Sequence, residues 1–204
     1  MSRRPPWQQR VIRVLSFQAP VLVTIGLALF IPLLAAAVEA RGLPSWLESR
    51  SYLLPALAAL GIGLFIGRQR PEIKDLSASD GLLITTAAWL VTGIAGAIPF
   101  ILLLDLSLTD AVFESVSGFT TAGTTMLTGL DTLPRSILVW RAMTQWLGGL
   151  GILLIILLIG QSQGSQGLHL LSAEGVKVSS GRLSLNFQRA AYRFTIIYLL
   201  LTVS

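Results

Sequence analysis

Residues 105–141, DLSLTDAVFESVSGFTTAGTTMLTGLDTLPRSILVWR, decide the fold of this chain. They lie between two uncharged runs of membrane-spanning length, Leu82–Leu104 and Ala142–Gly160. The stretch itself is too polar to cross a bilayer and too apolar for an ordinary solvated loop. Its organisation therefore needs an explanation that neither a span nor a surface loop provides.

A short helix is predicted over Asp110–Phe119, with Thr109 or Asp110 as its N-cap. A helix of this length rises about 15 Å, roughly half of the hydrocarbon core, so it is predicted to be re-entrant. The threonine-rich backbone after it, up to Thr125, is tolerated at membrane depth only inside protein or along a watery cavity. Its carbonyls are then free to replace the hydration shell of a cation, as in potassium-channel filters. An extracellular loop with a threonine-rich turn fits the same pattern.

The composition is that of a membrane protein. Of 204 residues, 53% are hydrophobic and 12% are charged, whereas an average soluble domain carries roughly 25% charged residues. Lipid is expected to be the solvent for much of the chain, and the predicted fold class is an all-α membrane protein. The net charge of +5 comes mostly from arginines in short segments between apolar runs, which argues against nucleic acid as a partner. Cysteine is absent, which excludes a disulfide framework and a thiol nucleophile.

Two further runs near the N-terminus are predicted to span the membrane, Val14–Val38 and Tyr52–Ile66. The first is longer than the apolar region of a cleaved signal peptide, an alternative that the arginines before it and its terminal alanines keep open. The last run, Phe194–Ser204, is too short to cross and has no polar cap. We therefore expect the chain to be part of a longer protein.

Basic residues predict the orientation. The N-terminal tail has four arginines and no acid, and the segments after the second and fourth runs are also basic. Under the positive-inside rule these parts are cytoplasmic, which predicts a multi-pass membrane protein with its N-terminus inside. The alternate segments carry more acids, and three of these are predicted to attract cations to the outer mouth of the loop: Asp110, Glu114 and Asp131.

An enzymatic function has no catalytic constellation behind it. The single histidine, His169, lies in a predicted cytoplasmic segment, no predicted span offers a histidine as base, and the turn-like stretch Ser115–Gly118 does not match G-x-S-x-G. Nucleotide-binding glycine patterns are absent too, and no covalent cofactor is expected. Arg141, at the start of a span, is expected either to pair with a mouth acid such as Asp131 or to extend outward to water.

Two long strings carry a family resemblance: FESVSGFTTAGTTMLTGLDTLP at residues 113–134 and WRAMTQWLGGLGI at residues 140–152. Through them the chain resembles the Trk/Ktr family of potassium transport subunits, of the TrkH type. The resemblance covers most of the chain and implies four tandem helix–pore loop–helix repeats around one pore. The chain would then hold two N-terminal transmembrane helices, one helix–pore loop–helix repeat and the start of a second.

The resemblance implies three parts. Residues 1–80 would be the N-terminal helix pair with its cytoplasmic tail, 81–160 the first repeat, and 161–204 the cytoplasmic connector and the truncated start of a second repeat. The potassium-selecting backbone would comprise Thr120, Thr121, Ala122, Gly123 and Thr124. The resemblance implies that the carbonyls of Thr121 and Ala122 contact potassium. It also implies that glycine at position 123 favours potassium over sodium.

The implied function is potassium uptake across the plasma membrane as part of a Trk-type transport subunit, with potassium as substrate and membrane lipid around it. The full-length form is expected to be a homodimer that binds a cytosolic nucleotide-binding regulatory subunit of the TrkA or KtrA type. One repeat supplies a quarter of such a filter. The alternative is a truncated, non-transporting membrane fragment that acts only as an anchor or assembly piece.

Overall fold

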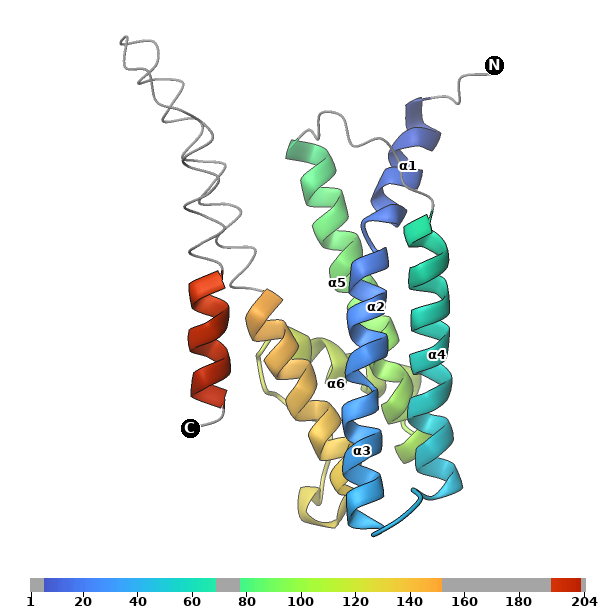
Figure 1. Ribbon diagram of the computed structural model, residues 1–204, viewed down its shortest axis with the longest axis vertical. Helices are drawn as coiled ribbons and strands as arrows, with labels where there is room; N and C mark the ends of the chain where they lie inside the picture. The colour runs from blue at the N-terminus through green and yellow to red at the C-terminus, as the bar shows by residue number, and fades with distance from the viewer. Residues whose placement is uncertain (1–5, 69–77, 152–191, 203–204) are drawn as a thin grey trace. The chain divides into compact units, whose positions relative to one another are not determined.

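The computed structural model describes residues 6–68, 78–151 and 192–202 (Figure 1). Every regular element in these ranges is helical, which confirms the predicted all-α class. The chain divides into two compact units, Met1–Gln145 and Trp146–Ser204. In chain order the elements are α1 (Pro6–Ser16), α2 (Ala19–Ala28), α3 (Phe30–Glu39), α4 (Trp46–Arg68), α5 (Ala78–Leu104), α6 (Leu108–Phe119), the 3-10 helix η1 (Leu130–Thr132), a helix over residues 135–151 and the helix Tyr192–Thr202.

Three of the predicted membrane spans are confirmed as helices. The segments Arg10–Glu39, Trp46–Arg68 and Ser79–Leu104 are long and apolar enough to cross a bilayer. The fourth predicted span, Ala142–Gly160, is helical as far as residue 151, and its remainder lies outside the described residues.

Two prolines interrupt the first of these segments, which therefore comprises three helices. Proline has no N–H, and its ring meets the carbonyl four residues earlier, so it breaks or kinks a helix. Pro20 lies just after the junction between α1 and α2, and Pro32 just after the junction at Leu29 between α2 and α3. At the first junction the Gln18 side-chain amide donates to the Val14 carbonyl oxygen at 3.0 Å, which adds a hydrogen bond where the helix is broken.

α4 begins earlier than the predicted span Tyr52–Ile66 because a capping box starts it at Trp46. The Ser45 hydroxyl oxygen accepts from the Glu48 N–H at 3.2 Å, and the Glu48 carboxylate accepts from the Ser45 N–H at 3.4 Å. Residues 46–51 therefore belong to the helix. The predicted span omitted them because they include polar and charged residues.

α2 packs mainly on α4, through small residues. A Cβ atom placed on Gly26 would lie 3.0 Å from the Ala56 carbonyl oxygen, and one on Gly63 would lie 3.0 Å from the Ala19 carbonyl oxygen. Backbones this close leave no room for a larger side chain, a contact typical of helices packed in lipid. α5 packs mainly on α6, the short helix in the lower half of Figure 1.

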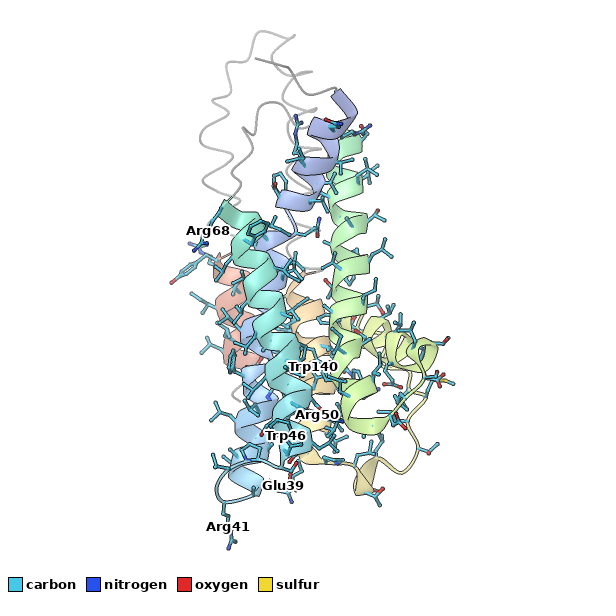
Figure 2. All side chains as sticks on the ribbon, turned by 90° about the vertical axis from the view of Figure 1, so that its right-hand side faces the viewer. Glu39, Arg41, Trp46, Arg50, Arg68 and Trp140 are labelled. Carbon is cyan, nitrogen blue, oxygen red and sulfur yellow. The ribbon has the colours of Figure 1, made fainter. Side chains whose placement is uncertain are left out.

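Charged and interfacial side chains lie at the ends of the first unit. Figure 2 shows Glu39, Arg41 and Trp46 near one end and Arg68 toward the other. Between these ends, large apolar side chains face outward, and Leu54 on α4 is 60% exposed. Such a surface suits lipid or further membrane helices.

The second unit holds an aromatic contact between two helices. The Trp146 indole N–H donates to the Thr202 hydroxyl at 2.9 Å, and the Tyr198 hydroxyl donates to the Trp146 carbonyl at 3.2 Å. The Trp146 and Tyr198 rings lie 5.7 Å apart between centroids. These contacts join the helix that ends the predicted first repeat to the short helix near the C-terminus.

Candidate functional site

α6 begins with a side-chain cap at Ser107. The Ser107 hydroxyl oxygen accepts from the Asp110 N–H at 3.2 Å, and the same hydroxyl donates to the Asp110 carboxylate at 2.8 Å. The predicted N-cap, Thr109 or Asp110, is therefore wrong, since the helix already begins at Leu108. Asp110 is the third helical residue and completes the capping pair from inside the helix.

Small residues let α6 approach both neighbouring helices. A Cβ atom on Gly96 of α5 would lie 2.5 Å from the Phe119 ring, and one on Gly118 would overlap with Thr144 of the helix after the loop. The Phe119 ring meets Trp140 edge to face, with 6.5 Å between centroids, and Trp140 is fully buried. One face of α6 is thereby packed against two helices, while Phe113 and Val116 on its other face are exposed.

A Schellman motif ends α6. The Thr121 N–H donates to the Gly118 carbonyl at 2.8 Å, and the Ala122 N–H donates to the Ser117 carbonyl at 3.0 Å. The motif needs a left-handed residue after the helix, and Thr121 takes that place with φ +59°. A side chain with a Cβ costs roughly 1–2 kcal/mol in this conformation, so neighbouring contacts must hold the backbone there.

Residues 120–128, the exit segment, follow α6 without regular secondary structure up to η1. The predicted change from a short helix to irregular backbone is thus confirmed, and residues 120–126 are exposed. Gly123 has φ +73°, and a Cβ atom placed there would meet nothing within 4 Å. Backbone conformation, not lack of space, therefore favours glycine at this position.

The carbonyls of the predicted filter residues differ in their partners. The Gly123 carbonyl accepts from Arg141 Nη2 at 2.8 Å, and the Thr124 carbonyl accepts from the Ser117 hydroxyl at 2.5 Å. Within the described part of the chain, no protein donor is hydrogen-bonded to the carbonyls of residues 120–122. These three carbonyls lie on exposed backbone and are available to a ligand.

The carboxylate of Glu114 lies inside the first unit and joins α6 to the exit segment. Glu114 is 1% exposed, and one of its oxygens accepts from the Thr125 hydroxyl at 2.6 Å and from the Met126 N–H. The other oxygen accepts from Arg141 Nε at 3.3 Å. The Arg141 side chain is 18% exposed, so both charges of the pair are largely removed from water and satisfied by each other.

The three acids predicted at the mouth lie in different surroundings. Glu114 is buried and accepts from protein donors, Asp110 is half-buried beside the cap of α6, and Asp131 is exposed in η1. The mouth role stays a prediction for all three. Of the two outcomes expected for Arg141, the structure shows pairing with one of these acids, and the partner is Glu114 and not the example given, Asp131.

Ser117 has no predicted role, although its hydroxyl joins α6 to the exit segment, and Glu114 is not singled out among the predicted mouth acids as the partner of Arg141. The pair of Glu114 and Arg141 could have been predicted from the sequence. An acid in a short helix at membrane depth and a base at the start of an apolar run each need a partner of opposite charge. The hydroxyl carries no such signal, since serine and threonine are common throughout this loop.

Comparison with known proteins identifies relatives over most of the chain. The family model of TrkH, described as a cation transport protein, matches residues 57–202. The Trk system potassium uptake protein TrkH of Escherichia coli K12 is 37% identical over 180 residues, which cover 86% of this chain and 36% of that protein. The TrkH of Halomonas elongata is 34% identical over 198 residues, which cover 95% of this chain and 39% of that protein.

A solved structure supports the same relationship. The crystal structure of the potassium transporter TrkH from Vibrio parahaemolyticus aligns with a TM-score of 0.68 and 30% sequence identity. The alignment covers 96% of this chain and 37% of that one. The chain therefore spans between a third and two fifths of the length of these relatives.

Proposed function

The chain belongs to the TrkH family of cation transport proteins, and from that premise we propose that it takes part in potassium uptake across the plasma (inner) membrane, as part of a Trk-type transport subunit. Relatives named potassium uptake protein support potassium as the substrate. Because the chain spans only part of their length, uptake by this chain belongs to the proposal. Potassium is the transported ion, and no covalent cofactor is proposed.

The observation that carries this proposal is the set of unengaged carbonyls at residues 120–122. Carbonyl oxygens select potassium by replacing its hydration shell, which requires that they be free of other donors. The irregular backbone at this point exposes them, because a helix or a sheet would have used them in its own hydrogen bonds. The carbonyls of Gly123 and Thr124 accept from protein donors and are weaker candidates within the predicted set.

A single exit segment supplies only part of a cation site, since potassium filters use rings of carbonyls from four loops. We propose that further helix–pore loop–helix units of the same kind complete the ring. In this arrangement residues 1–80 form the N-terminal helix pair, 81–160 the first repeat, and 161–204 the connector and the start of the second repeat.

Local electrostatics support a cation at the same place. The carboxyl end of a helix carries a partial negative charge, and α6 ends at Phe119, next to the unengaged carbonyls. Asp110 and Asp131 are not buried, and in the proposed function they raise the local concentration of cations at the outer mouth.

Orientation and partners are part of the proposal. The arginine-rich N-terminal tail would be cytoplasmic under the positive-inside rule. The full-length form would be a homodimer and would bind a cytosolic nucleotide-binding subunit of the TrkA or KtrA type. Nucleic acid is not among the proposed partners.

The test is rubidium uptake in a bacterium that lacks its own potassium uptake systems, with the protein expressed from its uninterrupted reading frame. Gly123→Val should reduce uptake per molecule at least about tenfold, because a β-branched residue resists positive φ and moves the selecting carbonyls. Unchanged uptake in this variant would remove the filter assignment.

Gly129→Val is the matched control, since Gly129 also has a positive φ, of 64°, but lies outside the predicted filter residues. It should keep most of the uptake per molecule. Membrane insertion of the parent without any uptake would favour the alternative, a non-transporting anchor or assembly piece.

A further inference from the structure

The exit segment is hydrogen-bonded to α6 and to the helix after it at residues 123, 125 and 126. The Arg141 guanidinium donates to the Gly123 carbonyl, and the Glu114 carboxylate accepts from the Thr125 hydroxyl and the Met126 N–H. Because Arg141 and Glu114 also pair with each other, these contacts form one continuous network. The network adjoins the three unengaged carbonyls without using any of them.

Stability is a weak reason for this pair. Removing two charges from water costs about as much as their attraction returns, and apolar residues of the same size often stabilise a protein more. What this pair does provide is one defined geometry, because the planar guanidinium holds its N–H donors at fixed angles and serves two acceptors at once. Here one group faces Glu114 and another faces Gly123.

The pair also balances charge close to the candidate ion site. An unpaired buried carboxylate in contact with residues 125 and 126 would attract a cation strongly, whereas conduction requires an ion to leave as well as to enter. Arg141 neutralises Glu114, so the carbonyl dipoles of the exit segment are left to set the strength of cation binding.

We propose that Glu114 and Arg141 are positioning residues of the exit segment, and that they set the selectivity for potassium over sodium by fixing the Gly123 carbonyl away from the ion and holding residues 125–126. The inference rests on the proposed function and concerns the same site. It gives Glu114 a different task from that of an acid at an open mouth.

The first experiment measures rubidium uptake and its inhibition by sodium for Arg141→Lys and Thr125→Val, each normalised to protein in the membrane. Lysine keeps the charge but cannot serve two acceptors through a rigid fork, and valine removes the hydroxyl that donates to Glu114 and accepts from the Leu127 N–H. Selectivity for rubidium over sodium should fall about tenfold in the first variant and about threefold in the second. Selectivity within about twofold of the parent in both variants would overturn the inference.

Arg135→Lys is the control for the arginine variant. Arg135 lies at the start of the same helix, its side chain is 80% exposed, and its ion pair with Glu39 is long at 3.7 Å. Its substitution should leave selectivity unchanged. If Arg141→Lys only lowered the amount of protein in the membrane, with normal selectivity for the remainder, the pair would be structural and the inference wrong.

A second readout does not depend on transport, so that failure of the proposed function can be told from failure of this inference. The chain has no cysteine, and a single one at exposed Ala122 reports on the exit segment alone. A nitroxide spin label attached to it should have a rotational correlation time about twofold shorter with Arg141→Lys than without it, because the loosened backbone moves more freely. A label at Leu43, which is 93% exposed, should have the same mobility in both backgrounds. Unchanged mobility at residue 122 would overturn the inference whether or not the parent transports.

Discussion

Two close contacts in the first unit are stabilised by different interactions. Where α2 meets α4, Gly26 and Gly63 bring backbones together, and the contacting atoms are carbonyls and apolar side chains. Where α6 and the exit segment meet the helix after them, hydroxyls, a carboxylate and a guanidinium make the contacts. Shape holds the first contact, and directed hydrogen bonds hold the second.

The difference teaches which parts of a membrane fold are constrained by packing and which by chemistry. Helices satisfy their own backbone groups, so two of them need only fit together in lipid. The exit segment has irregular backbone, and side chains must orient it. Substitutions in the two regions should therefore differ in kind, with loss of stability in one and loss of selectivity in the other.

The largest effect is expected from Gly118→Ala. Gly118 lies on α6 where this helix packs closely on the helix after the loop, next to the hydrogen-bonded exit segment. The added Cβ would overlap with Thr144, so we expect a loss of about 3 kcal/mol in unfolding free energy. The measurement is thermal denaturation of detergent-purified protein. Combination with Thr144→Ala should recover part of the loss, and an unaltered single variant would show that the two helices are farther apart than described.

Gly63→Ala probes the contact held by shape, with Gly61→Ala in the same helix as its match. A Cβ on Gly63 would lie 2.9 Å from Val23 and 3.0 Å from the Ala19 carbonyl oxygen, whereas nothing lies within 4 Å at Gly61. We expect a loss of about 2 kcal/mol for the first and no loss for the second. Both should keep parental selectivity. Equal stability of the two variants would contradict the close packing of α2 on α4.

Ser117→Ala removes the hydroxyl that donates to the Thr124 carbonyl. The expected loss is about 1 kcal/mol, together with a roughly threefold change in selectivity for rubidium over sodium, because that carbonyl is no longer oriented. Thr24→Ala is the match in α2, where the hydroxyl donates to the Pro20 carbonyl at 2.9 Å. If both variants altered selectivity, or neither did, the contrast between the two regions would fail.

The smallest effect concerns the left-handed residue at the end of α6. Thr121→Gly should relieve the strain of a positive φ and stabilise the protein by less than about 1 kcal/mol, since glycine also gains freedom in the unfolded chain. Thr120 has an ordinary φ of −81°, so Thr120→Gly should destabilise by about 0.5–1 kcal/mol. Opposite signs in thermal denaturation are the expected result, and a loss for both would argue against the Schellman motif.

Prediction from sequence succeeds here where one periodic or compositional property decides the outcome. The three spans and the short helix after α5 follow from apolar runs and their interruption, which local physics determines. Element ends are less certain, because several residues near each end can cap a helix. Ser107 caps α6 instead of Thr109 or Asp110, and Ser45 starts α4 before the apolar run. These choices depend on which hydroxyl meets a free N–H in the folded backbone.

The stretch at residues 105–141 summarises what each level of structure decided. A short helix followed by irregular, hydroxyl-rich backbone between membrane helices can be predicted from residue types alone, because length and polarity exclude a span. That Glu114 is buried and pairs with Arg141, and that the carbonyls of residues 120–122 stay unengaged, depends on the packed helices. The reason is physical: hydrogen bonds and ion pairs between distant residues depend on how helices pack, and no local pattern encodes that arrangement.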